Sequence, residues 1–221
     1  MIYLYIIFFS YFLGTFPTAL IVVGLFTGKD VRDSGSGNMG AMNTLRIVGK
    51  DKGTTSGFLV FLVVWLIDMG KAVLAVYITR FFLHQNNALG ITLATFFALL
   101  GHNYPIFLKF YGGRGAASLM GIFIYLDYKI FLIWLLTVFV FIILTEFIFN
   151  IFLKNKINLK FMVNAISEQI IGRLLGEIMA LFIIYFINKE VFFPALAGTF
   201  LVVIRHDKRI AQQLKIFKDR Q

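Results

Sequence analysis

The chain has 221 residues, of which 59% are hydrophobic and 14% charged, and its mean hydropathy is +0.85. This composition lies far from that of soluble domains and excludes a soluble globular protein. The absence of cysteine excludes disulfides, a thiolate metal site and a cysteine nucleophile. The formal net charge of +10 would fit a nucleic-acid partner only if the basic residues gathered on one soluble surface.

Seven apolar runs follow one another along the chain. In order they lie near residues 2–26, 56–79, 89–104, 116–126, 130–153, 161–187 and 191–204. The first run lacks a basic n-region and a small-residue cleavage pattern, so we expect it to be a retained span. The pattern predicts an all-α, polytopic membrane helical bundle that forms a single integral membrane domain over residues 1–221.

Two of these runs are short for a membrane crossing. A helix rises about 1.5 Å per residue, whereas the hydrocarbon of a bilayer is about 30 Å thick. Residues 116–126 are too few to cross it, and 191–204 are barely enough. We therefore predict about seven spans, with five as the alternative, and either count puts the two termini on opposite sides.

The basic residues are divided very unevenly between the connections. Sixteen of the 21 Lys and Arg residues lie over 27–55, 105–115, 154–160 and 205–221, whereas only three lie on the alternate connections. The positive-inside rule then predicts an outside N-terminus and a cytoplasmic C-terminus. The basic excess therefore indicates topology and attraction to anionic membrane lipid, and we expect no nucleic-acid partner.

The first polar loop has the sequence S-G-N-M-G-A-M-N-T-L-R-I-V-G and lies on the predicted cytoplasmic side. Its glycines can let backbone N–H groups converge on an anion, and its arginine offers a planar fork for phosphate. A solvated turn followed by an amphipathic helix is the alternative. We predict a phosphate site built from Ser36, Gly37, Asn38, Gly40, Asn43 and Arg46, with the two asparagines holding the loop.

The second polar loop, H-N-Y-P-I-F-L-K-F-Y-G-G-R-G, lies on the same predicted side and runs directly into an apolar segment. Glycines at the start of a helix allow close approach of a phosphate, which the helix dipole favours. The candidate phosphate ligands are Gly112, Gly113, Arg114 and Gly115. The G-K-[ST] ending of a nucleotide-binding P-loop is absent, so no nucleotide is implied. His102, at the start of the loop, is a candidate catalytic residue with a structural role as the alternative.

Asp68 and Lys71 lie inside the second apolar run, three residues apart, so they share one helix face. Charges at this depth face a partner or a wet cavity. Two roles stay open for this intramembrane polar pair, mutual neutralisation and contact with substrate. Arg173 and Glu177, four residues apart in the sixth run, are expected to form a structural pair.

Several motifs in order resemble those of the bacterial acyl-phosphate:glycerol-3-phosphate acyltransferases, the PlsY-type family. The family's S-G-N-x-G-x-x-N-x-x-R pattern is matched over residues 36–46, and its G-H-x-x-P-x-F-L-x-F-x-G-G-K-G pattern over 101–115, with Arg114 in place of lysine. Shorter matches are L-G-T-F-P at 13–17, D-V-R at 30–32 and the D-x-x-K of Asp68 and Lys71. The resemblance is specific over residues 11–118 and thin over 119–200.

The family's third motif, R-H-x-x-N-I-x-R-L followed by a glutamate, is altered in this chain. Arg205, His206 and Ile210 match, whereas Arg209 stands for the asparagine and Gln212 for the second arginine. No glutamate follows. Since the resemblance gives this histidine and asparagine a part in activity, the departure puts catalytic competence in question.

The resemblance implies transfer of a fatty acyl group from acyl-phosphate to the 1-hydroxyl of glycerol 3-phosphate, giving lysophosphatidic acid and phosphate. It implies Ser36, Arg46, His102 and His206 as catalytic residues in an enzyme of a bacterial inner (plasma) membrane, with its loops facing the cytoplasm. We expect no cofactor and no metal. Two alternatives stay open: an impaired paralogue that binds phospholipid or acyl-phosphate, and an organophosphate transporter.

Overall fold

The computed structural model describes residues 1–83, 87–152 and 170–218, and every regular element in these residues is a helix. The expected all-α class is confirmed. The chain forms two compact units, Met1–Leu126 and Asp127–Gln221, called unit 1 and unit 2 below. The expectation of one domain stays a prediction.

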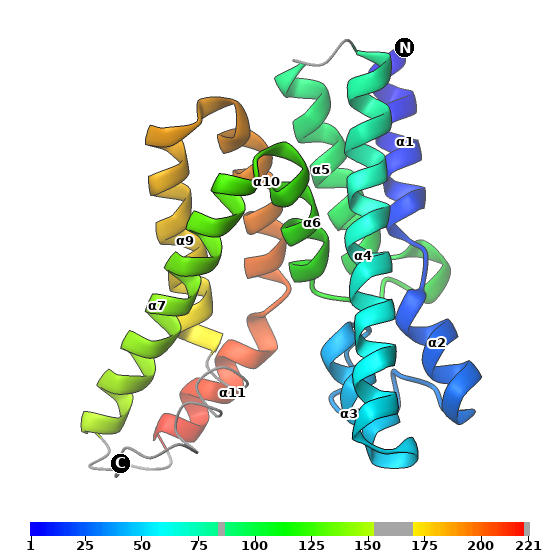
Figure 1. The fold of residues 1–221 in the computed structure, drawn as a ribbon, viewed down its shortest axis with the longest axis vertical. Coiled ribbons are helices and arrows are strands. Elements are labelled where there is room, and N and C mark those ends of the chain that lie inside the picture. The colour runs from blue at the N-terminus through cyan, green and yellow to red at the C-terminus, as the bar shows by residue number, and fades with distance from the viewer. Residues whose placement is uncertain (84–86, 153–169, 219–221) are drawn as a thin grey trace. The chain divides into compact units, whose positions relative to one another are not determined.

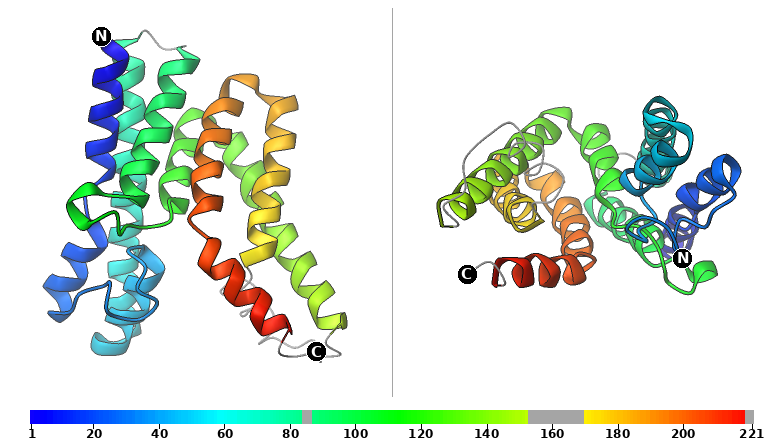
Figure 2. Two further views of the ribbon diagram at one scale, coloured as in Figure 1. Left: turned by 180° about the vertical axis from the view of Figure 1, so that it is seen from behind. Right: turned by 90° about the horizontal axis from the view of Figure 1, so that it is seen from below.

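Unit 1 contains six α-helices and one short 3₁₀ helix among its described residues. In chain order they are α1 (Ile2–Gly14), α2 (Thr18–Thr27), α3 (Ala41–Lys52), α4 (Thr54–Phe82), α5 (Ala88–Asn103), η1 (Ile106–Leu108) and α6 (Ala116–Leu126). Helices α1, α4 and α5 run side by side, while α2 and α3 lie at the end of the unit remote from the N-terminus (Figures 1 and 2). Both polar loops therefore lie away from the N-terminal end of unit 1.

The first apolar run, expected as one helix, is broken between α1 and α2. Pro17 has no N–H to donate and disfavours helical backbone at the residue before it, so the helix stops at Gly14 and restarts at Thr18. At the break the Phe16 carbonyl accepts a hydrogen bond of 3.0 Å from the Thr18 N–H and also faces Lys71 inside the unit. That carbonyl becomes part of the candidate site.

Helices α1 and α5 approach very closely because a glycine of each faces the backbone of the other. A Cβ at Gly14 would lie 2.1 Å from the Ala98 carbonyl oxygen, and one at Gly101 would lie 2.1 Å from that of Tyr11. Small residues at such contacts let helix backbones pack tightly inside a membrane. The close approach brings the end of α5 beside the break after α1.

A hydrophobic cluster anchors the first polar loop to the helices around it. Val31 and Met39 of the loop are buried with Val23 of α2, Val48 of α3 and Val64 of α4. These buried side chains hold both ends of the glycine-rich stretch, although most of its own residues are partly or fully exposed. The loop is therefore a packed element.

Unit 2 contains four helices among its described residues, α7 (Tyr128–Phe152), α9 (Ile170–Ile187), α10 (Lys189–Ile204) and α11 (Asp207–Lys218). Helix α9 packs along α7 through Gly172 and Gly176, where a Cβ would lie 2.7 Å from the Phe141 carbonyl oxygen or 2.6 Å from the Val138 Cα atom. The Gln213 side chain of α11 accepts hydrogen bonds from the first two N–H groups of α9, at 2.9 and 3.1 Å. This contact joins the C-terminal helix to the rest of the unit.

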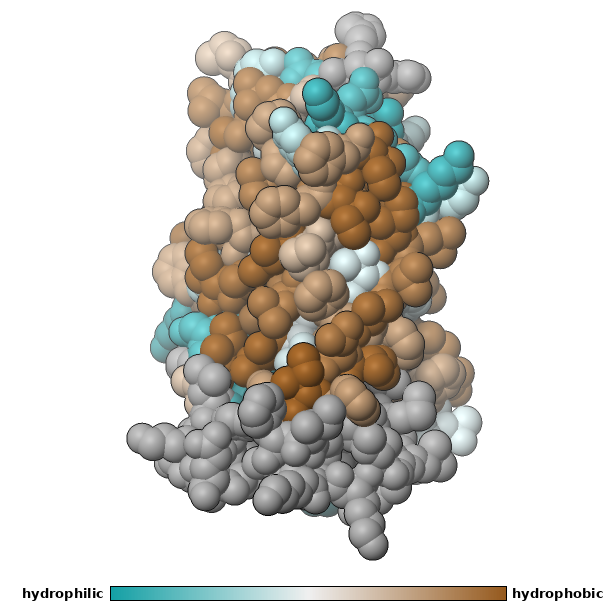
Figure 3. Space-filling model, turned by 90° about the vertical axis from the view of Figure 1, so that its left-hand side faces the viewer, coloured by the Kyte–Doolittle hydropathy of each residue, from teal (hydrophilic) through white to brown (hydrophobic). Residues whose placement is uncertain are grey.

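Five stretches of the described residues are long and apolar enough to cross a membrane: Ile2–Thr27, Thr54–Phe82, Ala88–Leu108, Tyr128–Phe149 and Ile170–Ile187. Helix α6, with 11 residues, falls short, as its sequence indicated. The coloured part of the face in Figure 3 carries mostly apolar side chains, with hydrophilic side chains near the top and at the lower left. The seven-span count and the orientation of the termini stay predictions.

Candidate functional site

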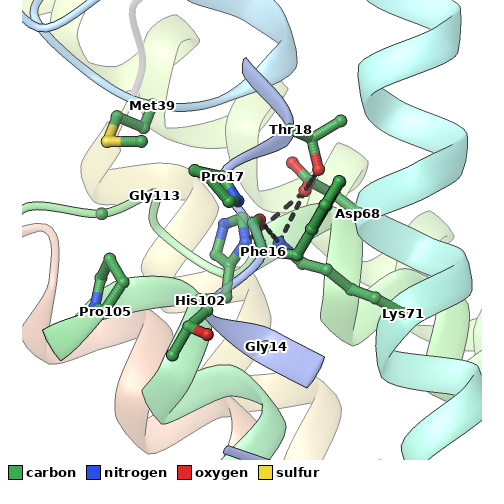
Figure 4. A pocket seen from close by; sticks show the side chains of 12 residues that line it. Gly14, Phe16, Pro17, Thr18, Met39, Asp68, Lys71, His102, Pro105 and Gly113 are labelled. Carbon is green, nitrogen blue, oxygen red and sulfur yellow. Dashed lines mark hydrogen bonds and ion pairs between the residues drawn. The ribbon is translucent and has the colours of Figure 1, made fainter. Parts of the chain in front are cut away.

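A small polar pocket inside unit 1 brings the two glycine-rich loops together. Met39 of the first loop and Pro105, Gly112 and Gly113 of the second line it, with Asp68 of α4 forming its floor (Figure 4). Its cavity volume is about 10 Å³. Because that is room for about one water molecule, a larger ligand has to lie at the pocket's mouth.

The floor of the pocket is a buried ion pair. The Lys71 ammonium lies 2.9 Å from Asp68 Oδ1, and the two side chains are 7% and 3% exposed. Thr18 Oγ1 of α2 donates a hydrogen bond of 3.0 Å to the same carboxylate oxygen. The prediction that Asp68 and Lys71 share a face is confirmed, and the structure adds the partner that the sequence did not indicate.

Lys71 also occupies the break between α1 and α2. Its Nζ donates a hydrogen bond of 2.9 Å to the carbonyl oxygen of Phe16, which the interruption at Pro17 leaves available. A non-helical backbone at membrane depth needs such an internal partner, because lipid offers none. One lysine thus neutralises Asp68 and satisfies the irregular backbone.

His102, at the end of α5, lies between the ion pair and the second loop (Figure 4). Its Nδ1 is 3.7 Å from Asp68 Oδ1, slightly beyond hydrogen-bond length, and its side chain is 6% exposed. On the other side of the ring, a Cβ at position 113 would lie 2.0 Å from Nε2. The imidazole therefore packs directly against Gly113.

The second loop closes on itself at this histidine. The Gly113 N–H donates a hydrogen bond of 2.9 Å to the His102 carbonyl oxygen. Lys109 and Phe110, in the middle of the loop, have positive φ angles of 53° and 62°, which non-glycine residues seldom adopt. Because its N–H already donates within the loop, Gly113 can offer a phosphate only close approach of the backbone. The half-buried Arg114 supplies positive charge.

In the first loop the structure gives Asn43 a holding role. Its Oδ1 accepts a hydrogen bond of 2.8 Å from the Ser36 N–H, and its Nδ2 donates to the carbonyl oxygens of Val31 and Ser34 at 3.2 and 3.0 Å. The residue is 1% exposed. Its polar atoms serve the loop backbone, as predicted for an asparagine that holds the loop.

Other predicted ligands of the first loop lie closer to solvent. Ser36 and Arg46 are exposed, while Gly37, Asn38 and Gly40 are half-buried, and Gly40 immediately precedes α3. Just upstream, Arg32 makes a forked pair with Asp30, with Nε–Oδ1 and Nη2–Oδ2 distances of 3.0 and 2.6 Å. Hydrogen bonding to the guanidinium lowers the pKa of Asp30 from its usual value.

The residues of the third motif lie in unit 2. His206, between α10 and α11, is 3% exposed, and its Nδ1 lies 2.7 Å from the Val202 carbonyl oxygen. Since a carbonyl only accepts, Nδ1 carries the proton of this hydrogen bond. Arg209, at the position of the family's asparagine, is half-buried, and Gln212 is exposed.

Three residues of the site were missed from the sequence: Thr18, Met39 and Ser118. Ser118 Oγ of α6 donates a hydrogen bond of 3.0 Å to the Asp68 backbone carbonyl, which joins α6 to α4. Thr18 and Ser118 each lie 50 residues from Asp68. A small hydroxyl residue in an apolar run carries no signal for such a contact, although Thr18 directly follows the helix-breaking Pro17.

Comparison with known proteins extends the resemblance over nearly the whole chain. A family model described as "Glycerol-3-phosphate acyltransferase" matches residues 4–215. The chain belongs to the glycerol-3-phosphate acyltransferase family. A glycerol-3-phosphate acyltransferase of Wolbachia pipientis subsp. Culex pipiens is 32% identical over 210 residues, which cover 93% of this chain and 92% of that protein.

Other family members match more strongly over a shorter stretch. Glycerol-3-phosphate acyltransferase 1 of Dehalococcoides mccartyi is 41% identical over 117 residues, and the chain spans only about half of that relative, 52% of its length. The crystal structure of PlsY (YgiH), an integral membrane glycerol 3-phosphate acyltransferase, in its glycerol 3-phosphate form, superposes with a TM-score of 0.69 at 24% identity. That match covers 97% of this chain and 93% of the other, and it shows a shared fold.

Proposed function

We propose that this protein transfers a fatty acyl group from acyl-phosphate to the 1-hydroxyl of glycerol 3-phosphate, giving lysophosphatidic acid and inorganic phosphate. The observation that carries the proposal is the meeting of the two glycine-rich loops at one polar pocket within unit 1. Each loop has the composition of a phosphate site, and the reaction joins two phosphorylated substrates. Family membership supports the acyltransferase chemistry.

In this proposal the first loop binds one phosphate and the second loop the other. Ser36 and Arg46, both exposed, contact a substrate that arrives from water, and Asn43 holds the loop around it. Gly112, Gly113 and Gly115 allow the donor's phosphate to approach the backbone, and Arg114 offsets its charge. Further phosphate contacts come from Gly37, Asn38 and Gly40.

The chemistry requires positioning more than activation. Acyl-phosphate carries a good leaving group, so the enzyme has to align the hydroxyl with the acyl carbon and neutralise the departing phosphate. His102 and His206 are the residues that we assign to orienting a phosphate or accepting the hydroxyl proton. The acyl chain enters from the bilayer, which the apolar surface of the helices favours.

We place the enzyme in a bacterial inner membrane with both loops facing the cytoplasm. The support is the uneven distribution of Lys and Arg along the chain together with the position of both loops away from the N-terminal end of unit 1. Modification of single engineered cysteines from either side of sealed vesicles tests this orientation directly, because the native chain has none.

The test of function is phosphate release by the purified protein from palmitoyl phosphate, with and without glycerol 3-phosphate. Release that depends on the acceptor and yields lysophosphatidic acid supports the proposal. Activity with palmitoyl-CoA in place of palmitoyl phosphate would support an acyltransferase activity but reject acyl-phosphate as the donor. If a folded protein that still binds glycerol 3-phosphate is inactive with both donors, it is the impaired paralogue. Arg209 and Gln212, which depart from the family's third motif, are the reason for considering that alternative.

A further inference from the structure

The second polar loop carries an apolar tip, residues 106–111, with the sequence I-F-L-K-F-Y. Four of its large side chains are between 49% and 72% exposed: Ile106, Phe107, Phe110 and Tyr111. Lys109 is the only charged residue of this segment. A connection that runs through water normally carries polar and turn-forming residues, so solvation does not explain this composition.

The backbone of the apolar tip is satisfied inside the protein, although the tip forms only the short 3₁₀ helix η1. Five of its six N–H groups donate hydrogen bonds of 3.0 to 3.2 Å to acceptors within unit 1, namely those of Ile106, Leu108, Lys109, Phe110 and Tyr111. The positive φ angles of Lys109 and Phe110 belong to this closure, since the Phe110 N–H turns back to the Pro105 carbonyl. Irregular backbone is tolerated at membrane depth only where internal partners replace water. The apolar tip meets that requirement.

The position of the apolar tip points to the membrane as well. The tip projects sideways from unit 1 at the level of the break between α1 and α2, whereas α2 and α3 reach farther from the N-terminal end (Figures 1 and 2). That break lies inside the apolar stretch Ile2–Thr27, and a second such stretch, Ala88–Leu108, ends within the tip itself. The rings of Phe107 and Phe12, both at least half exposed, lie 6.0 Å apart. The exposed apolar face of α1 thus continues onto the tip.

We propose that the apolar tip is inserted in the lipid bilayer and is held there by Phe107 and Phe110. Lipid covers the exposed rings, and aromatic side chains are favoured at the boundary between hydrocarbon and head groups. The ammonium of Lys109 reaches toward the head groups while its stem stays beside the rings. The proposal concerns the membrane position of the loop and does not depend on which reaction the protein catalyses.

Insertion gives the two ends of the second loop different surroundings. The apolar tip lies in lipid, while Gly112 and Gly113, the residues that follow it, line the polar pocket. Tyr11 of α1 fixes this arrangement, because its hydroxyl accepts from the Ile106 N–H at 3.1 Å and donates to the Tyr104 carbonyl oxygen at 2.8 Å. An amphiphilic molecule can then move from the bilayer to the pocket along the loop without passing through bulk water.

Site-directed spin labelling tests the insertion without any measurement of activity, and the chain has no native cysteine to interfere. Nitroxide labels at Phe107→Cys and Phe110→Cys, in protein reconstituted in lipid nanodiscs, are compared by collision with oxygen, which partitions into lipid, and with a water-soluble nickel chelate. Two exposed residues calibrate the scale, Leu66 inside an apolar stretch of α4 and Lys50 of α3 outside such stretches. The oxygen-to-nickel ratio at both tip positions should lie closer to that of Leu66→Cys than to that of Lys50→Cys.

Two results would overturn the proposal. A ratio near that of Lys50→Cys at either tip position would place that side chain in water. Weak collision with both reagents would show that protein covers the tip, as in an assembly of two copies of the chain.

A second experiment asks whether the two rings hold the apolar tip in the lipid. With the label at Tyr111→Cys, the pair Phe107→Ser and Phe110→Ser should shift the oxygen-to-nickel ratio toward the value of Lys50→Cys. The pair Phe107→Leu and Phe110→Leu is the matched control, because it keeps apolar side chains and should leave the ratio unchanged. No shift with the serine pair, or the same shift with the leucine pair, would reject the anchoring role. None of these results changes if the proposed acyl transfer fails its own test.

Discussion

Two charged pairs lie inside apolar helices of this protein, and their surroundings differ sharply. In unit 1, Asp68 and Lys71 have a hydroxyl, a backbone carbonyl and a histidine around them. In unit 2, Glu177 is 1% exposed, and its Oε2 makes no hydrogen bond within the residues that the structure describes. Similar sequence signals, an acid and a base one helical turn apart, thus lead to a connected network in one case and a less satisfied carboxylate in the other.

The difference lies in the polar groups that surround each membrane-embedded pair. The first pair lies where a helix is broken, a glycine-rich loop returns and two other helices end, so polar backbone is at hand. The second pair lies within α9, directly after the two glycines that contact α7, and regular helices already satisfy their own backbone there. A buried ion pair therefore becomes part of a site where non-helical backbone next to it has polar groups available for hydrogen bonds.

The largest effect is expected from Lys71→Met. The substitution leaves the Asp68 charge buried and removes the donor to the Phe16 carbonyl, so the free energy of unfolding should fall by about 3–5 kcal/mol. Thermal unfolding in detergent measures the effect. Lys71→Met combined with Asp68→Asn should recover part of the loss. If the free energy of unfolding falls no more than it does for a substitution of an exposed residue, the difference claimed between the two pairs is wrong.

The next largest effects on stability are expected from alanine substitutions at close backbone contacts, one in each unit. Alanine at Gly113 or at Gly176 places a Cβ 2.0 Å from the His102 Nε2 or 2.6 Å from the Val138 Cα, and each should lower stability by about 1–3 kcal/mol. Only Gly113→Ala should also raise the KM for the acyl donor. Gly24→Ala is the control, because nothing lies within 4 Å of its Cβ position. Equal kinetic effects at the two glycines would remove the distinction between site and scaffold.

Glu177→Gln should change stability less than any break in the first pair. The amide keeps the shape of the side chain and replaces a carboxyl group whose Oε2 makes no hydrogen bond within the described residues, so the loss should stay below about 1 kcal/mol. Chemical denaturation measures the free energy of unfolding of Glu177→Gln and of Lys71→Met for this comparison. A loss near 3 kcal/mol would show that the second pair is as tightly coupled as the first.

The smallest effect on stability is expected at the partly exposed pair of Asp30 and Arg32. Asp30→Asn should reduce stability by less than about 0.5 kcal/mol at neutral pH, because solvent screens the pair. The pKa of Asp30 is lowered in the folded protein, so its contribution is complete above the ordinary value of 3.8 and is lost as pH falls through the lowered one. Melting curves of native protein and Asp30→Asn should therefore differ equally at pH 5 and pH 8. A difference that grows between these values would refute this assignment.

Much of the fold was predictable because its signals are local. Apolar runs mark the helices, and the short run at 116–126 proved to be a helix of 11 residues, too short to span. The break at Pro17 was not predicted, although the proline is visible, because the flanking residues are apolar enough for one continuous span. Span count and orientation depend on the bilayer and stay predictions.

The candidate site was predictable in its residue types and less so in its connections. Asn43 holds the first loop as expected from an amide among glycines, and Asp68 and Lys71 pair as their spacing requires. The partners Thr18 and Ser118 were missed, since a hydroxyl in an apolar run is equally compatible with a bond to its own helix.

The sequence by itself determined the membrane class, the glycine-rich loops and the shared face of Asp68 and Lys71, because composition and helical periodicity act over a few residues. Only the tertiary structure decided that the Phe16 carbonyl accepts from Lys71, that His102 lies between Asp68 and Gly113, and that Met39 reaches the same pocket. Of these contacts, the hydrogen bond from Lys71 to Phe16 joins residues 55 positions apart in the chain. These contacts depend on the close packing of α1 on α5 and on the break at Pro17, which no local pattern specifies.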